Sequence, residues 1–89
     1  MADGESATGA AMSKFDRIDK LCARRAQNGI KEYGCLDLAT DPRDFSREAQ
    51  EELLDAINYV KWAMARGDMS IVEGAVILHF IKGIYRLLI

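Results

Sequence analysis

Apolar residues recur every three or four positions in three stretches of the chain, a pattern that predicts helices with one buried face. The first stretch, 14–33, repeats Phe15, Ile18, Cys22, Ala26 and Tyr33 on one side. The second, 42–66, carries an apolar stripe as well, and the third, 71–89, is apolar almost all round and must be buried on most sides. No segment has the period of a strand. The pattern therefore predicts an all-α fold, a three-helix antiparallel unit that forms an oligomeric helical bundle.

Residues typical of helix ends bound these stretches. The starts are predicted at Ser13, at Asp41 with the proline after it as first helical residue, and at Ser70. Gly34 and Gly67 are suited to the left-handed conformation that ends a helix. The connections between the helices are therefore short.

The first twelve residues are small or polar and lack apolar periodicity, so we expect 1–12 to be a disordered tail and 13–89 to be a single helical domain. A chain of 89 residues is marginal for a self-sufficient core. We therefore expect a homo-oligomer, a dimer or a tetramer, held through the apolar C-terminal helix.

Composition excludes several classes of function. A net charge of −2 gives no field for binding nucleic acid. The third stretch approaches the about 20 apolar residues of a membrane span, but Glu73, His79, Lys82 and Arg86 interrupt it, so we expect no membrane insertion. The N-terminus lacks a secretory pattern, and the two cysteines have no metal or disulfide spacing, which indicates a cytoplasmic protein.

Four carboxylates fall close together in the second predicted helix. At about 100° per residue, Glu48, Glu52 and Asp55 stack along one edge with Tyr59, and Glu51 lies beside them. Carboxylate oxygens at one-turn spacing are suitable ligands for Mg²⁺. The alternative is an ordinary solvated face. Like charges at i,i+4 without interleaved lysines favour a bound cation, because repulsion otherwise destabilises the helix.

Two neighbouring features extend this edge toward a ligand site. Asn58 and Tyr59 offer an amide and an aromatic ring where a base or sugar could lie, and Trp62 is a weaker candidate for stacking. On the first predicted helix, Arg24 and Lys31 belong to a basic face. That face could neutralise a triphosphate or form salt bridges with the acids of the second helix.

The acidic run, Glu48-x-x-Glu51-Glu52-x-x-Asp55 followed by Asn58 and Tyr59, resembles small MazG-like proteins, members of the all-α nucleotide pyrophosphohydrolases. The runs 29–34 and 41–44 add to the resemblance, which covers roughly residues 17–66. In that family, oligomeric helical bundles hold Mg²⁺ with carboxylates from two helices, and water cleaves the α–β phosphate link of a nucleoside triphosphate. The resemblance implies the same reaction here, with an NTP or dNTP as substrate and Mg²⁺, or Mn²⁺, as cofactor.

The resemblance also implies a role for each candidate residue. The metal ligands would be Glu48, Glu51, Glu52 and Asp55; the catalytic residues Glu51 and Glu52; the substrate-binding residues Asn58, Tyr59, Arg24 and Lys31.

The chain departs from the family pattern at its second acidic motif. The family usually has E-x-x-D on the following helix, whereas Glu73 is followed three positions later by Val76. Either a second copy supplies the missing acids, or catalysis is weakened or lost. Glu73 itself could complete a site or simply cap its helix. The alternative function is a non-catalytic helical module for oligomerisation or partner binding.

Overall fold

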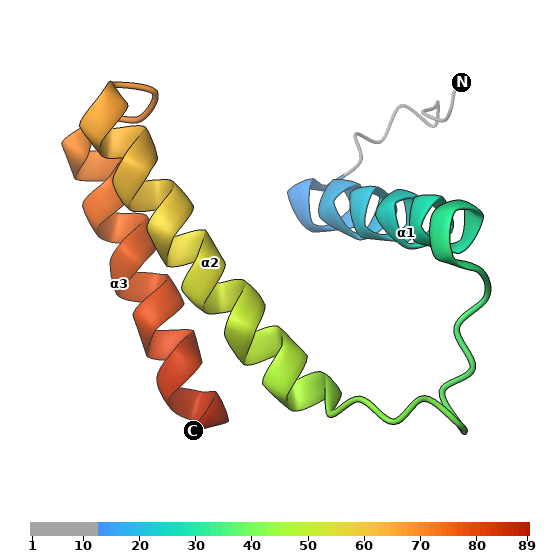
Figure 1. Ribbon diagram of the computed structural model, residues 1–89. Helices are drawn as coiled ribbons and strands as arrows, with labels where there is room; N and C mark the ends of the chain where they lie inside the picture. The colour runs from blue at the N-terminus through green and yellow to red at the C-terminus, as the bar shows by residue number, and fades with distance from the viewer. Residues whose placement is uncertain (1–12) are drawn as a thin grey trace, which may run out of the picture. The chain divides into compact units, whose positions relative to one another are not determined.

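A computed structural model of the protein describes residues 13–89. Three α-helices make up this part, α1 (Lys14–Tyr33), α2 (Phe45–Arg66) and α3 (Ile71–Leu88), and residues 13–89 contain no strand (Figure 1). The all-α prediction is confirmed. The chain divides into two compact units, one ending at Asp41 and the other beginning at Pro42. The predicted tail, 1–12, lies outside the described residues.

The first unit contains α1, with the predicted ends. Ser13 accepts a hydrogen bond from the backbone N–H of Asp16 (3.0 Å), and Gly34 has a φ of 92° and donates its N–H to the Ile30 carbonyl (2.8 Å). No residue of α1 is buried, and Phe15 and Tyr33 are 80% and 84% exposed. The amphipathic helix is therefore formed, while its apolar face is uncovered in its own unit.

The predicted start of α2 at Asp41 and the following proline is wrong. The helix begins at Phe45, and Asp44 is its N-cap, because the Asp44 carboxylate accepts from the backbone N–H groups of both Ser46 (3.0 Å) and Arg47 (3.2 Å). The first N–H groups of a helix have no partner within the helix, so a side chain that satisfies two of them determines where the helix starts.

The second unit is an antiparallel hairpin of α2 and α3 (Figure 1). Gly67 makes the turn with a φ of 88°, and Ser70 caps α3 by accepting from the N–H of Glu73 (3.1 Å). At one end of the interface Met64 lies against Gly74, and at the other the Gln50 amide donates to the Leu88 carbonyl (3.1 Å).

Between these two ends, half-buried and buried side chains recur at alternating spacings of three and four residues, the pattern of a coiled-coil seam. They are Leu53, Ile57 and Val60 from α2, and Leu78, Ile81 and Tyr85 from α3.

The core of the hairpin is thin. Among residues 13–89, Val60 is the one buried hydrophobic side chain, at 9% exposure. Much of α3 faces outward instead, with Val72 and Leu87 at 75% and 85% exposure. α3 is therefore apolar nearly all round, as predicted, and the hairpin by itself leaves much of that apolar surface unburied. No helix in the described part of the chain combines the length and hydropathy needed to cross a membrane.

Candidate functional site

The predicted acidic residues form one strip along α2, on the side of the helix that faces away from α3. The seam with α3 occupies the side of Leu53, Ile57 and Val60, and the 3.6-residue period places Glu48, Glu52 and Asp55 roughly opposite. Successive members are one turn apart, so their Cβ atoms are about 5–6 Å apart. We call Glu48, Glu51, Glu52 and Asp55 the acidic strip.

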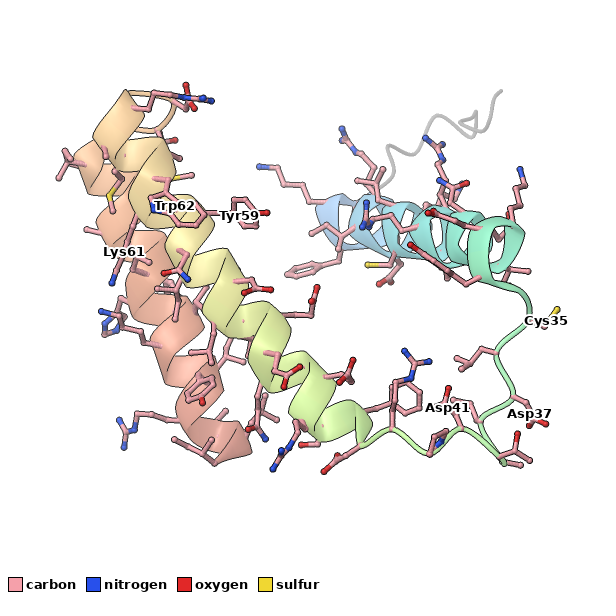
Figure 2. All side chains as sticks on the ribbon, viewed as in Figure 1. Cys35, Asp37, Asp41, Tyr59, Lys61 and Trp62 are labelled. Atoms are coloured by element: carbon pink, nitrogen blue, oxygen red, sulfur yellow. The ribbon has the colours of Figure 1, made fainter. Side chains whose placement is uncertain are left out.

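The acidic strip is largely open to solvent, and its carboxylates are not ion-paired within the described residues. Glu51, Glu52 and Asp55 are exposed, and Glu48 is half-buried. Within residues 13–89, none of the four carboxylates has a hydrogen-bond or ion-pair partner. The nearest lysine in sequence, Lys61, points away from the side of α2 on which Tyr59 lies (Figure 2). The strip therefore concentrates negative charge with no lysine or arginine between Glu48 and Asp55.

Three or more metal-binding side chains do not come together in the described part of the chain. The carboxylates are spread along the helix axis, over about two turns. Mg²⁺ commonly keeps several waters and takes only one or two protein carboxylates together with phosphate oxygens. Neighbouring pairs in the strip, such as Glu48 with Glu52 or Glu52 with Asp55, offer a donor set of that size.

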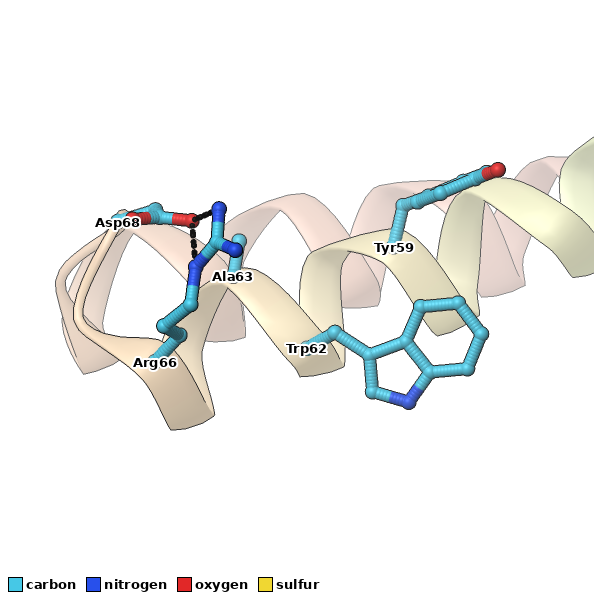
Figure 3. Close-up of a pocket in the computed structure, with 5 residues that line it drawn as sticks. All are labelled: Tyr59, Trp62, Ala63, Arg66 and Asp68. Atoms are coloured by element: carbon cyan, nitrogen blue, oxygen red, sulfur yellow. Dashed lines mark hydrogen bonds and ion pairs between the residues drawn. The ribbon is translucent and has the colours of Figure 1, made fainter.

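A shallow pocket adjoins the strip toward the C-terminal end of α2. Its volume is about 390 Å³, and it is lined by Tyr59, Trp62, Ala63, Arg66 and Asp68 (Figure 3). The Tyr59 and Trp62 rings meet edge to face, with centroids 5.6 Å apart and an interplanar angle of 89°. Both rings are more than half exposed, so their faces are accessible to a planar ligand.

The far wall of the pocket is an ion pair that the spacing of sequence motifs does not reveal. Arg66 Nε donates to Asp68 Oδ2 at 2.7 Å (Figure 3). The two residues meet because Gly67 takes the left-handed conformation and turns the chain back on the end of α2. A signal for the aromatic part was present, since Trp62 follows Asp55 by seven positions and so lies on the same side of the helix.

The structure brings some of the predicted site residues together. The acidic strip, Asn58 and Tyr59 all lie on α2, and Asn58 and Tyr59 are exposed. Arg24 and Lys31 are exposed on α1 and belong to the other unit. Their predicted part in substrate binding stays a prediction.

Glu73 does not join the acidic strip of its own chain. It lies near the Met64 end of the hairpin, whereas the strip lies toward the opposite end. Its carboxylate accepts from the Ser70 hydroxyl (3.2 Å), and its backbone N–H donates to the same oxygen (3.1 Å). The interpretation of Glu73 as an N-terminal capping residue of α3 is confirmed.

The described residues thus define an all-α protein with a helical hairpin that carries an acidic strip and an aromatic pocket. No protein-family model, curated protein or solved structure matches the chain.

Proposed function

We propose that the protein is a Mg²⁺-dependent nucleoside triphosphate pyrophosphohydrolase that works as a homo-oligomer. The observation that carries the proposal is the unpaired acidic strip, continued on the same helix by an exposed aromatic pocket. A nucleotide needs both parts, since its phosphates require cations held by carboxylates and its base requires an aromatic surface. The reaction converts an NTP or dNTP and one water into the monophosphate, pyrophosphate and a proton.

The residues of the strip divide this work between them. Glu48, Glu51, Glu52 and Asp55 would supply oxygen ligands, and Glu51 or Glu52 would accept the proton of the water that attacks the α-phosphorus. The bond to the bridging α–β oxygen breaks, and that oxygen leaves with the pyrophosphate. Bound Mg²⁺, or Mn²⁺, would neutralise phosphate charge at this point.

The substrate would extend along α2 from the strip to the pocket. The rise of about 1.5 Å per residue puts Asp55 and Trp62 about 10 Å apart along the helix, a span that suits a triphosphate and sugar. Tyr59 and Trp62 would contact the base, with Asn58 beside the sugar. Arg24 and Lys31 would neutralise the remaining phosphate charge, and a second copy would contribute the acids that α3 lacks.

A second candidate function is favoured by a different observation. The apolar faces of α1 and α3 are exposed, with Phe15 at 80% and Leu87 at 85%. A non-catalytic helical module that oligomerises or binds a partner would use these faces and would leave the acidic strip idle. The two candidates differ in whether the strip binds a metal.

Turnover and metal binding test the first candidate together. The purified protein is incubated with Mg²⁺ and a panel of ribo- and deoxyribonucleoside triphosphates, and pyrophosphate release is measured. We expect release with at least one nucleotide, and we expect Mg²⁺ or Mn²⁺ to raise the melting temperature.

Variants locate the effect. Glu52→Gln and Asp55→Asn should abolish turnover and the thermal shift, while their folding is unchanged or slightly stabilised because repulsion in the strip is relieved. Asp19→Asn, which removes an exposed carboxylate on α1, is the matched control and should retain both. No turnover with any nucleotide and no thermal shift with either metal would contradict the enzyme and favour the non-catalytic module.

A further inference from the structure

One face of α3 carries a second coiled-coil seam that nothing in the second unit covers. Its members are spaced three, four and three residues apart, like those of the seam with α2. They are Ile77, Phe80, Ile84 and Leu87, with exposures of 36%, 64%, 49% and 85%. We call these four residues the α3 ridge. A seam that is regular in spacing and apolar throughout is what a helix presents to another helix.

The basic residues of α3 keep away from the ridge, whereas the carboxylate of Glu73, four positions before Ile77, continues the line of the ridge at the start of the helix. At about 100° per residue, Lys82 and Arg86 fall on the side of α3 opposite the ridge, and His79 lies next to them. The hairpin therefore has one broad apolar face and one basic face. Such segregation is typical of a helix that docks by one face and remains solvated on the other.

On the apolar face of the hairpin, α2 contributes small residues. Ala49, Ala56 and Ala63 recur every seven positions, and Ala56 and Ala63 are half-buried. In an antiparallel pair of right-handed helices, these positions turn to the same side as the α3 ridge. They form a shallow strip beside the ridge, which we call the alanine groove.

The ridge and the groove match each other in register. The pairs Met64 with Gly74 and Gln50 with Leu88 set the levels along the hairpin. By that register Ala56 is level with Lys82, midway between Phe80 and Ile84 of the ridge. Ala63 and Ala49 are level with positions 75 and 89, two residues from Ile77 and Leu87 respectively.

We infer that the apolar face binds a second copy of the same hairpin, forming an antiparallel four-helix bundle. A two-fold axis parallel to the helices keeps every level unchanged, so the α3 ridge of each copy lies in the alanine groove of the other. The partner's Ala56 then sits between Phe80 and Ile84. The same two-fold rotation therefore places each ridge in the groove of the other copy, as a self-complementary interface requires.

The exposed apolar area is sufficient for such an interface. The ridge together with Phe45 and Val76, which are 40% and 51% exposed, offers on the order of 600 Å² per copy, approaching the about 800 Å² that each partner of a standard interface buries. Patches on monomeric proteins rarely exceed a few hundred Å². The proposed function includes a homo-oligomer, and the four-helix bundle specifies that oligomer. The bundle rests on this part of the proposed function alone, because its formation requires neither metal nor nucleotide.

Sedimentation velocity of the full-length protein tests the inference. The wild type should be a dimer at micromolar concentration. Phe80→Glu should raise the dissociation constant on the order of 100-fold or more, since two buried rings are lost per dimer. Lys82→Glu introduces the same residue, glutamate, on the opposite face of α3, and this variant should remain dimeric. Ala56→Glu should weaken the dimer from the groove side.

The double variant Phe80→Glu with Ala56→Lys distinguishes ridge-in-groove packing from other packings. Each new carboxylate would face a new ammonium of the partner, so association should be partly restored. A monomeric wild type, a dimer indifferent to Phe80→Glu, or a double variant no better than the single one would overturn the inference. If circular dichroism shows that Phe80→Glu loses helicity, the double variant provides the test: it should regain both the helicity and the sedimenting mass of a dimer, and failure to regain either would overturn the inference. A monomeric wild type that still releases pyrophosphate would overturn the bundle and leave the enzymatic activity standing. A wild-type dimer that passes these tests and releases no pyrophosphate would contradict the enzymatic activity alone.

Discussion

Gly74 is the residue on which the closest approach of α2 and α3 depends. It is buried, and a Cβ atom added there would overlap Met64 Sδ and Cγ. Glycine normally weakens a helix relative to alanine by about 1 kcal/mol. Here that local cost is offset because the missing side chain lets the Met64 thioether pack directly on the backbone of α3.

Replacing Gly74 with alanine should therefore destabilise the protein, despite the better helix propensity of alanine. We expect a loss of about 1–3 kcal/mol in the free energy of unfolding, because Met64 must leave its position or the helices must separate. Urea unfolding followed by circular dichroism at 222 nm measures the change.

Gly83 provides the matched control in the same helix. A Cβ at Gly83 would meet nothing within 4 Å. Gly83→Ala should therefore gain up to about 1 kcal/mol of stability from helix propensity. If both variants were stabilised to the same extent, the close packing of Met64 on Gly74 would be refuted.

At the scale of elements, helix ends depend on which side chain reaches the free N–H groups. Asp41 is the predicted N-cap of α2, because the proline that follows it favours the first helical position. In the structure, the N–H of Asp41 donates to the Asp37 carbonyl (2.9 Å), which makes it part of the preceding turn. Asp44, three positions on, is the cap of α2.

Removing this cap should shorten and destabilise α2. Asp44→Ala is expected to cost about 1 kcal/mol, because the N–H groups of Ser46 and Arg47 lose their acceptor. Asp44→Asn should preserve most of the stability, since an amide oxygen also caps. Thermal unfolding monitored at 222 nm compares the three proteins, and an Asp44→Ala melting temperature equal to that of the wild type would rule out the capping role.

The three helices, their approximate bounds and the acidic strip could be predicted from the sequence, because each depends on local periodicity and capping. Ser13, Gly34, Gly67 and Ser70 act where local chemistry places them. The aromatic pocket could not be predicted fully, since the Arg66–Asp68 wall needs the turn at Gly67. Periodicity gives the face of α3 that is apolar, but it does not give the partner that covers that face.

At the scale of the whole molecule, the balance of buried and exposed apolar surface is unusual for a chain of 89 residues. The described part has one buried hydrophobic side chain, Val60, while large apolar residues on α1 and α3 are more than half exposed. Hydrophobic burial is the main favourable contribution to folding, and it must exceed the conformational entropy of about 1–2 kcal/mol per ordered residue. A hairpin with so little burial needs apolar surface from outside itself, which the inferred bundle would supply.

The thermal stability of the protein should therefore depend on its concentration. For a dimer that unfolds to separate chains, a hundredfold dilution removes about 2.7 kcal/mol of stabilisation. This corresponds to a fall in melting temperature of roughly 5–10 °C for a dimer of two such chains. Differential scanning fluorimetry or circular dichroism over a concentration series measures the slope. Phe80→Glu should melt at a lower temperature that no longer changes with concentration, whereas Lys82→Glu should follow the wild type. A wild-type melting temperature that is constant over the series would mean that a single chain is stable alone and that no second copy covers the α3 ridge.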